Sequence, residues 1–112
     1  MNITPFIAEL IGTTFLLTLG QGVVANVNLK KTIAENQNPW LLITITWGFA
    51  VFIGVFIAAS ISGAHLNPAV TLGLAVAGKF SWSLVPSYML AQLIGAMLGS
   101  WISYIAYIDH YK

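Results

Sequence analysis

Three long apolar segments dominate the chain and predict three helices that cross a membrane. They cover residues 5–28, 40–61 and 82–107, and each reaches the ~20 residues that the hydrocarbon core of a bilayer requires. The polar residues between the first two segments, at positions 30–39, predict an extended loop in water. The fold class expected from this pattern is an all-α membrane protein in which residues 1–112 form a single membrane domain.

A shorter apolar segment follows a polar interruption that reads Ser-Gly-Ala-His-Leu-Asn-Pro-Ala-Val-Thr over residues 62–71. Asn67 and Pro68 are residue types favoured as helix N-cap and first helical residue, and Gly78 is a stop signal. They predict a helix over residues 67–77, roughly 15 Å long and thus about half as long as a bilayer core is thick. Non-helical backbone at membrane depth must be buried in protein or line a cavity. We therefore expect the loop to fold back, so that this half-helix begins near the membrane midplane.

Small residues recur at four-residue spacing on each long segment, a pattern that lets helices approach closely. The three stripes are Thr14, Thr18 and Gly22; Ala50, Gly54, Ala58 and Ser62; and Ala91, Gly95, Gly99 and Ser103. Trp47 falls within the arc of the second stripe at 100° per residue. We expect Trp47 to face protein rather than lipid, either at the wall of a cavity or filling a gap between helices.

Composition agrees with a membrane protein, because 58% of the residues are hydrophobic and 6% are charged, against about 25% charged in soluble domains. The absence of Cys excludes disulfides and thiolate metal sites, and a net charge of +1 does not indicate a nucleic-acid partner. The first segment lacks a basic n-region and a cleavage pattern, so we expect it to be retained as a span. The expected partner is the lipid bilayer, the expected location is the cell membrane, and no cofactor is expected.

Glu9 and Gln92 are polar residues inside predicted spans. A carboxylate in a span is unfavourable unless it faces protein or water, so Glu9 either faces the interior or reaches the interface from the end of its helix. Gln92 is expected to form hydrogen bonds between helices, and a position on the wall of a pore is the alternative.

The polar interruption predicts a narrow lane for neutral solutes. Its backbone carbonyls offer hydrogen-bond acceptors, and they belong to Gly63, Ala64, His65 and Leu66. Capping occupies the side-chain oxygen of Asn67 and leaves its NH2 donors free for a hydroxyl or a water. The positive end of the half-helix disfavours cations, so the lane suits uncharged hydrogen-bonding solutes.

Neither catalysis nor a metal site is expected. Glu9 and His65 are too few ligands for a metal shell, and no nucleophile motif accompanies them. The His65 side chain is expected to hold the loop by hydrogen bonding, with contact to solute as a second role. Asp109 and His110, at the end of the sequence, are expected to be solvated rather than to bind metal.

Residues 62–71 resemble the first Asn-Pro-Ala loop of the major intrinsic protein family, the aquaporins and glycerol facilitators. Residues 8–13 (Ala-Glu-Leu-Ile-Gly-Thr) and 91–96 (Ala-Gln-Leu-Ile-Gly-Ala) support the resemblance, which therefore covers nearly the whole chain. It implies a right-handed bundle of two inverted repeats, each with three spans and one half-helix. It also implies tetramers with one pore per subunit.

The resemblance implies roles for individual residues. Asn67 would donate to the permeant in mid-pore, residues 63–66 would supply carbonyl acceptors, and Glu9 would brace the loop through its backbone N–H groups. Trp47 stands at the family's aromatic constriction, where water-selective members commonly have Phe and glycerol facilitators have Trp. An indole face can pack against the carbon chain of a polyol. The implied function is a passive channel for glycerol and other small uncharged solutes, with a water-selective channel as the alternative.

The resemblance extends over the first repeat alone, because the second Asn-Pro-Ala motif, the constriction Arg and the opposing half-helix have no counterpart in these 112 residues. Two hypotheses follow. In the first, the chain is half of a channel that conducts when it pairs with a second half, as a homo-oligomer or with another half-channel. In the second, it is a non-conducting fragment or assembly partner.

Overall fold

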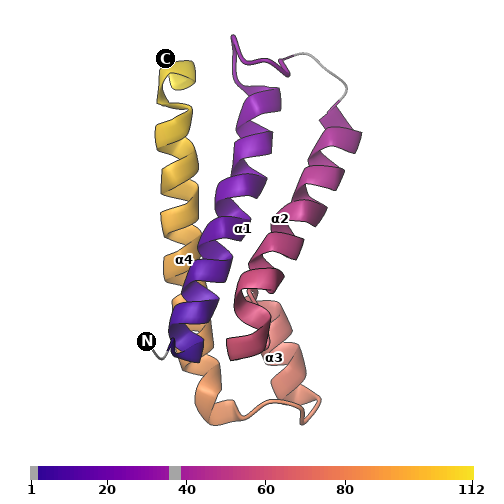
Figure 1. Ribbon diagram of the computed structural model, residues 1–112, viewed down its shortest axis with the longest axis vertical. Coiled ribbons are helices and arrows are strands. Elements are labelled where there is room, and N and C mark those ends of the chain that lie inside the picture. The colour runs from indigo at the N-terminus through magenta and orange to yellow at the C-terminus, as the bar shows by residue number, and fades with distance from the viewer. Residues whose placement is uncertain (1–2, 36–38) are drawn as a thin grey trace.

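The computed structural model describes residues 3–35 and 39–112, and it has three long helices at the expected positions (Figure 1). They are α1 (Pro5–Asn28), α2 (Pro39–Ser62) and α4 (Val85–Ala106), and α4 follows directly on the short 3-10 helix η1 (Trp82–Leu84). By length and composition, α1, α2 and the segment Trp82–Ala106 can each cross a membrane. Part of the loop expected at positions 30–39, residues 36–38, lies outside the described residues.

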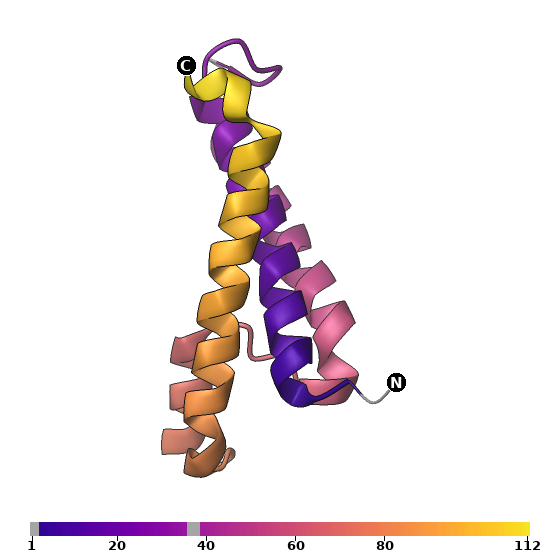
Figure 2. The same ribbon diagram turned by 90° about the vertical axis from the view of Figure 1, so that its left-hand side faces the viewer.

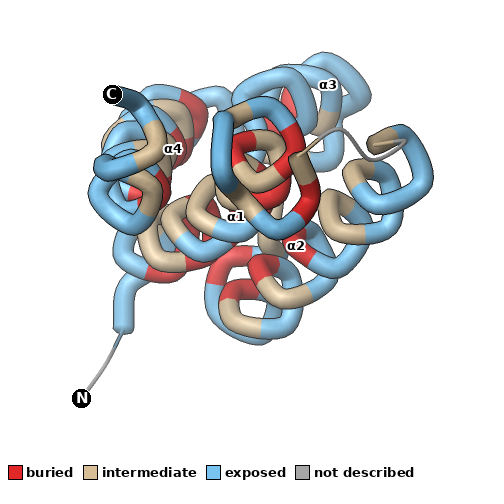
Figure 3. Tube along the Cα trace, turned by 90° about the horizontal axis from the view of Figure 1, so that it is seen from above, coloured by how far each residue is buried: buried red, intermediate tan, exposed pale blue. Residues whose placement is uncertain are grey.

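The long helices are arranged around α1, which contacts both α2 and α4. In Figures 1 and 2, α1 and α4 run upward and α2 runs downward. The short helix α3 (Pro68–Val76) lies at the lower end and contacts α4, and the 3-10 helix η2 (Ile108–Tyr111) follows α4 at the upper end. Viewed along the helices in Figure 3, the buried residues gather on the helix faces that turn toward one another.

The predicted small-residue stripes are confirmed as the contact faces of the helices. The buried residues of α2 are Ala50, Gly54, Ala58 and Ser62, and those of α4 include Ala91, Gly95, Gly99 and Ser103. A Cβ atom added to Gly95 would lie 2.5 Å from the carbonyl oxygen of Leu10, so the α1 and α4 backbones are in direct contact there. The stripe on α1 lies against α4 as well, because Thr18 Oγ1 donates to the carbonyl oxygen of Gly99 at 3.3 Å.

The short helix α3 begins and ends where its sequence predicts. Asn67 is the N-cap, and its side chain accepts a hydrogen bond from the Ala69 N–H at 2.8 Å. At the other end the N–H of Lys79 donates to the carbonyl of Leu74, while Gly78 adopts a positive φ of 71°. This is a Schellman cap, which suits glycine because that residue has no Cβ to clash in the left-handed region. With 9 residues, α3 is too short to cross a bilayer.

Between α2 and α3 the chain turns back toward the middle of the molecule, and Figure 2 shows this loop above the lower end of α2. The side chain of Leu66 marks how far it returns. A Cβ atom added to Gly12 would lie 2.7 Å from a methyl carbon of Leu66, and one added to Gly54 would lie 2.9 Å from the other. Gly54 is about two turns before the end of α2, so the Leu66 methyl groups lie roughly 12 Å back along α2 from its end. The absence of side chains on Gly12 and Gly54 makes the space that Leu66 fills.

Candidate functional site

The loop that precedes α3 has an unusual backbone. Gly63, Ala64 and Leu66 have φ values of 84°, 50° and 55°. The left-handed region is unfavourable for residues that carry a Cβ, and it persists only where the surrounding structure holds the chain in place. The loop conformation must therefore be fixed by contacts with the rest of the molecule.

Glu9 on α1 supplies the main contacts that hold the loop. It is fully buried, with 0% of its surface exposed. Its Oε1 accepts from Ser62 Oγ at 2.6 Å and from the His65 N–H at 2.8 Å, and its Oε2 accepts from the Leu66 N–H at 2.7 Å. Gln92 Nε2 on α4 donates to the same Oε2 at 2.8 Å. A carboxylate has about four acceptor positions, so these four donors match its capacity.

Burial decides between the two expectations for Glu9. The alternative in which its carboxylate reaches the membrane interface from the end of the helix is wrong, because the side chain has no exposed surface. The observed bonds to the backbone of the loop are the ones that a bracing role requires.

A second set of contacts joins the loop to α3 and α4 through Thr71. Its Oγ1 lies 3.0 Å from both Gln92 Nε2 and His65 Nδ1, and 3.3 Å from the carbonyl oxygen of Asn67. All three contacts are satisfied when Thr71 donates to Asn67 O and accepts from Gln92 and from Nδ1–H of His65. Gln92 therefore bonds to α1 and α3 at once, as expected for a residue that links helices.

Two aromatic residues pack against the ring of His65: Phe80 in the loop before η1, and Tyr88 in α4. The His65 ring centroid lies 4.6 Å from that of Phe80 and 4.9 Å from that of Tyr88. Tyr88 Oη also donates to the carbonyl oxygen of Ser62 at 2.7 Å. The side chain of His65 is thus held by both a hydrogen bond and two aromatic contacts.

A cavity of about 720 Å³ opens between the loop, α1, α2 and α4. Its lining includes four residues with polar side chains, Thr13, His65, Asn67 and Gln92, together with the loop residues Ala64 and Leu66. The apolar side of the cavity includes Leu17, Trp47, Val51, Val55, Val70 and Leu93. The N-terminal residues of α3, Asn67 and Pro68, both line it. The positive end of the α3 dipole therefore lies beside a cavity in an otherwise apolar molecule.

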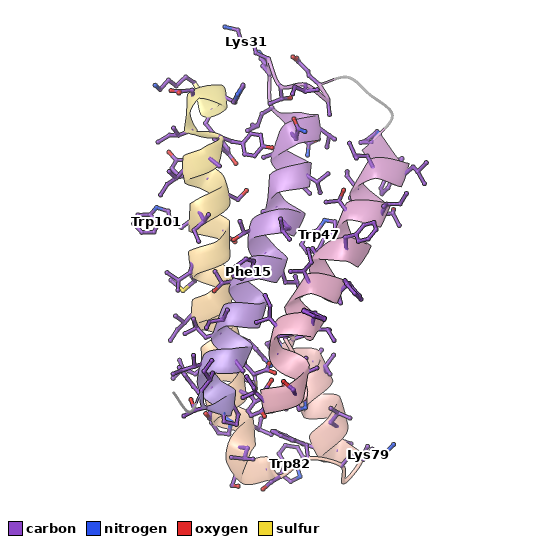
Figure 4. All side chains as sticks on the ribbon, in the orientation of Figure 1. Phe15, Lys31, Trp47, Lys79, Trp82 and Trp101 are labelled. Atoms are coloured by element: carbon purple, nitrogen blue, oxygen red, sulfur yellow. The ribbon has the colours of Figure 1, made fainter. Side chains whose placement is uncertain are left out.

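Trp47 occupies the side of this cavity formed by α1 and α2. Figure 4 shows it between these two helices. A Cβ on Gly20 of α1 would lie 2.5 Å from the indole ring, so Gly20 makes room for the ring. Trp47 therefore faces protein, as its place in the small-residue stripe predicts. Its ring both lines the cavity and fills the gap between α1 and α2.

A sequence model of the family described as major intrinsic protein matches residues 1–111. The chain belongs to the major intrinsic protein family. It is accordingly a multi-pass integral membrane protein of a family of channels, which transport solutes and are not enzymes.

Individual family members agree with this assignment. The chain is 50% identical to the probable glycerol uptake facilitator protein of Thermotoga maritima over 107 residues, which are 96% of the chain and 45% of that protein. It is 46% identical to the glycerol uptake facilitator protein of Bacillus subtilis over 97% of the chain and 39% of the relative. The X-ray structure of the aquaglyceroporin from Plasmodium falciparum superposes with a TM-score of 0.84 at 40% identity, over 93% of this chain and 41% of that one. The chain thus spans less than half the length of these relatives.

The structure brings together most of the residues singled out from the sequence. Asn67, Trp47, Ala64, His65, Leu66, Pro68 and Gln92 line the cavity. Two of the singled-out residues, Gly63 and Glu9, do not line the cavity among the described residues. Gly63 is exposed at the surface, and Glu9 is fully buried beneath the loop. In the part of the chain that is described, no group of three His, Cys, Asp or Glu side chains is placed to hold a metal ion.

Sequence reasoning missed three residues that hold this site. Thr71 is fully buried between Gln92 and His65, and Tyr88 bonds to the end of α2. Ser62 was recognised as a small contact residue but not as a donor to Glu9. A signal was available for Thr71, since it stands one turn after Asn67 on the same face of the half-helix. For Tyr88 no local signal exists, because its partner is remote in the sequence.

Proposed function

We propose that this chain forms one half of a passive channel for glycerol and other small uncharged solutes, and that it carries out no catalysis. The observation that carries the proposal is the two-sided cavity. A braced loop and the N-cap Asn67 form one side, and Trp47 with aliphatic residues forms the other.

This arrangement fits the chemistry of a polyol. Glycerol has hydroxyl groups along one side and carbon on the other. The Asn67 amide NH2 and the backbone carbonyls of residues 64–66, which line the cavity, would exchange hydrogen bonds with the hydroxyls. Trp47 and its aliphatic neighbours would contact the carbons. The positive end of α3 disfavours cations, so the path is selective by its lining and needs neither a bound metal nor a covalent step.

Glycerol is favoured over water alone by the residue at position 47. The indole of Trp47 supplies a broad apolar face beside the polar loop, which a water molecule does not need and a polyol carbon chain does. The similar proteins named glycerol uptake facilitator or aquaglyceroporin point the same way. A water-selective half-channel is the second candidate.

The complete pore requires a second half. The relatives extend to more than twice the length matched here, and Asn67 at the tip of α3 is exposed in the described chain. An exposed polar helix end at membrane depth must meet protein or water rather than lipid. We propose that a second repeat covers the cavity, either within one polypeptide or by the antiparallel association of two copies of this chain.

Flux through liposomes tests the proposal. The protein is reconstituted alone, and also together with the second half of the Thermotoga maritima relative, and glycerol-driven reswelling is followed by light scattering. We expect reswelling faster than in empty liposomes when both halves are present. Inserted protein that gives no faster reswelling in either sample would overturn the channel proposal and favour the non-conducting assembly partner.

Trp47→Leu tests the role of the indole in selectivity. Trp101→Leu is the matched control, because Trp101 is 63% exposed and points away from the other helices in Figure 4. We expect Trp47→Leu to lower glycerol flux about fivefold or more relative to water flux, since it removes the apolar face for the carbon chain. Trp101→Leu should leave the ratio of glycerol to water flux unchanged. Equal ratios in both variants would favour the water-selective candidate.

A further inference from the structure

Two buried polar atoms at the α1–α4 contact have no hydrogen-bond partner within residues 3–35 and 39–112. They are Thr13 Oγ1 and Gln92 Oε1. Thr13 is 2% exposed and Gln92 is 1% exposed. Buried polar atoms are nearly always paired in native proteins, so each needs an explanation. The two are complementary, because a hydroxyl can donate and an amide oxygen can only accept.

The packing of α1 against α4 brings Thr13 and Gln92 to the same region of the helix contact. Glu9 and Gln92 are in contact, with 2.8 Å between Oε2 and Nε2. One turn further along each helix, Thr13 Cβ lies 3.1 Å from the position of a Cβ on Gly95. Since α1 and α4 run in the same direction, Thr13 stands about one turn above the Gln92 amide. Thr13 and Gln92 also line the same cavity.

Hydrogen bonds hold the NH2 group of the Gln92 amide but not its oxygen among the described residues. Its Nε2 donates to Glu9 Oε2 and to Thr71 Oγ1. A reversed amide would place Oε1 against the Glu9 carboxylate, and two acceptors repel each other. The observed orientation leaves Oε1 without a donor, and a buried carbonyl in that state is strongly unfavourable. A donor on the Oε1 side would remove this conflict.

We propose that Thr13 is a positioning residue whose hydroxyl supplies this donor to Gln92 Oε1 through one buried water in the cavity that both residues line. The hydroxyl thereby keeps the Gln92 amide oriented. Through Glu9, the amide in turn stabilises the loop N–H groups of His65 and Leu66. Thr13 would thus support the loop from α1 indirectly, in addition to the direct hydrogen bonds of Glu9.

Hydrogen exchange of the His65 and Leu66 amides tests the proposal. It is measured by NMR on the 15N-labelled protein in lipid nanodiscs. Thr13→Val keeps the shape of the side chain and removes the hydroxyl, while Thr13→Ser keeps the hydroxyl. We expect both amides to exchange about fivefold or more faster in Thr13→Val, and to stay within about twofold of the parent in Thr13→Ser.

Thr14→Val is the matched control, because Thr14 Oγ1 donates at 2.7 Å to the Leu10 carbonyl of its own helix. It should leave both loop amides within about twofold of the parent. In a double-mutant cycle, Thr13→Val should add little once Gln92→Met has removed the amide. Unchanged exchange in Thr13→Val, equal acceleration in Thr14→Val, or full additivity with Gln92→Met would overturn the proposal. The measurement does not depend on glycerol flux, so it fails or succeeds separately from the proposed function.

Discussion

Glu9 is the single residue on which the loop depends most directly. Four donors converge on its carboxylate, and two of them are backbone N–H groups next to residues with positive φ. A carboxylate can accept on both oxygens, whereas an amide offers one acceptor and one donor group. The identity of the side chain at position 9 is therefore set by the number of donors that it must satisfy.

Replacing Glu9 by Gln should destabilise the protein strongly. The new NH2 group would face a donor, so at least one buried N–H would lose its partner. We expect a loss of about 2–4 kcal/mol in the free energy of unfolding. It can be measured by SDS titration of the protein in mild detergent, followed by far-UV circular dichroism.

Asp109→Asn is the control for that substitution. Asp109 is 83% exposed and pairs only with Lys112 among the described residues, so the change should stay within about 0.5 kcal/mol. A Glu9→Gln protein as stable as this control would show that the carboxylate is not needed to hold the loop.

At the scale of helices, the sequence predicts those helix bounds and contact faces that depend on residues close together in the chain. The bounds of α1 and α3 follow from the run of apolar residues together with Pro5, Asn67, Pro68 and Gly78, each of which acts within a few residues of its own position. The contact faces follow because small residues at four-residue spacing point the same way.

What the sequence could not predict depends on how the helices face one another. The position of Glu9 near the start of α1 was compatible with burial and with exposure, and only packing against α2, α4 and the loop decides. The bonds of Tyr88 to Ser62 and of Gln92 to Thr71 join remote residues, so no periodicity reports them.

Two glycine substitutions test how closely the helices pack. In Gly95→Ala the new Cβ would meet the Leu10 carbonyl oxygen at 2.5 Å, and α1 and α4 would have to separate. We expect a loss of about 1–3 kcal/mol in unfolding free energy. Gly48→Ala is the matched variant on α2, because its added Cβ meets nothing within 4 Å in the described chain.

Gly48→Ala should leave stability unchanged or raise it by about 0.5–1 kcal/mol, since alanine is the better helix former. Both variants can be compared by the same SDS titration. Similar effects from the two would show that the α1–α4 contact accommodates an added methyl group, against this prediction.

At the scale of the whole molecule, α3 carries a glycine one turn beyond the cavity. Val70 lines the cavity, and Gly73 stands about one turn further along the same side of α3. Within the described residues, a Cβ on Gly73 meets nothing within 4 Å. A glycine inside a helix costs about 1 kcal/mol relative to alanine, so an intrachain contact does not account for it. The second repeat proposed above would account for it by packing closely on α3.

Gly73→Leu should therefore separate folding from assembly. The open space within one chain accommodates the side chain, so helicity and unfolding free energy should change by no more than about 0.5 kcal/mol. A second repeat that packs on α3 would be displaced, and glycerol flux in the presence of both halves should fall together with their co-purification. Gly73→Ala serves as the graded control, with a smaller loss expected because one methyl group needs less room. Normal flux and normal co-purification in Gly73→Leu would place the second repeat away from this face of α3.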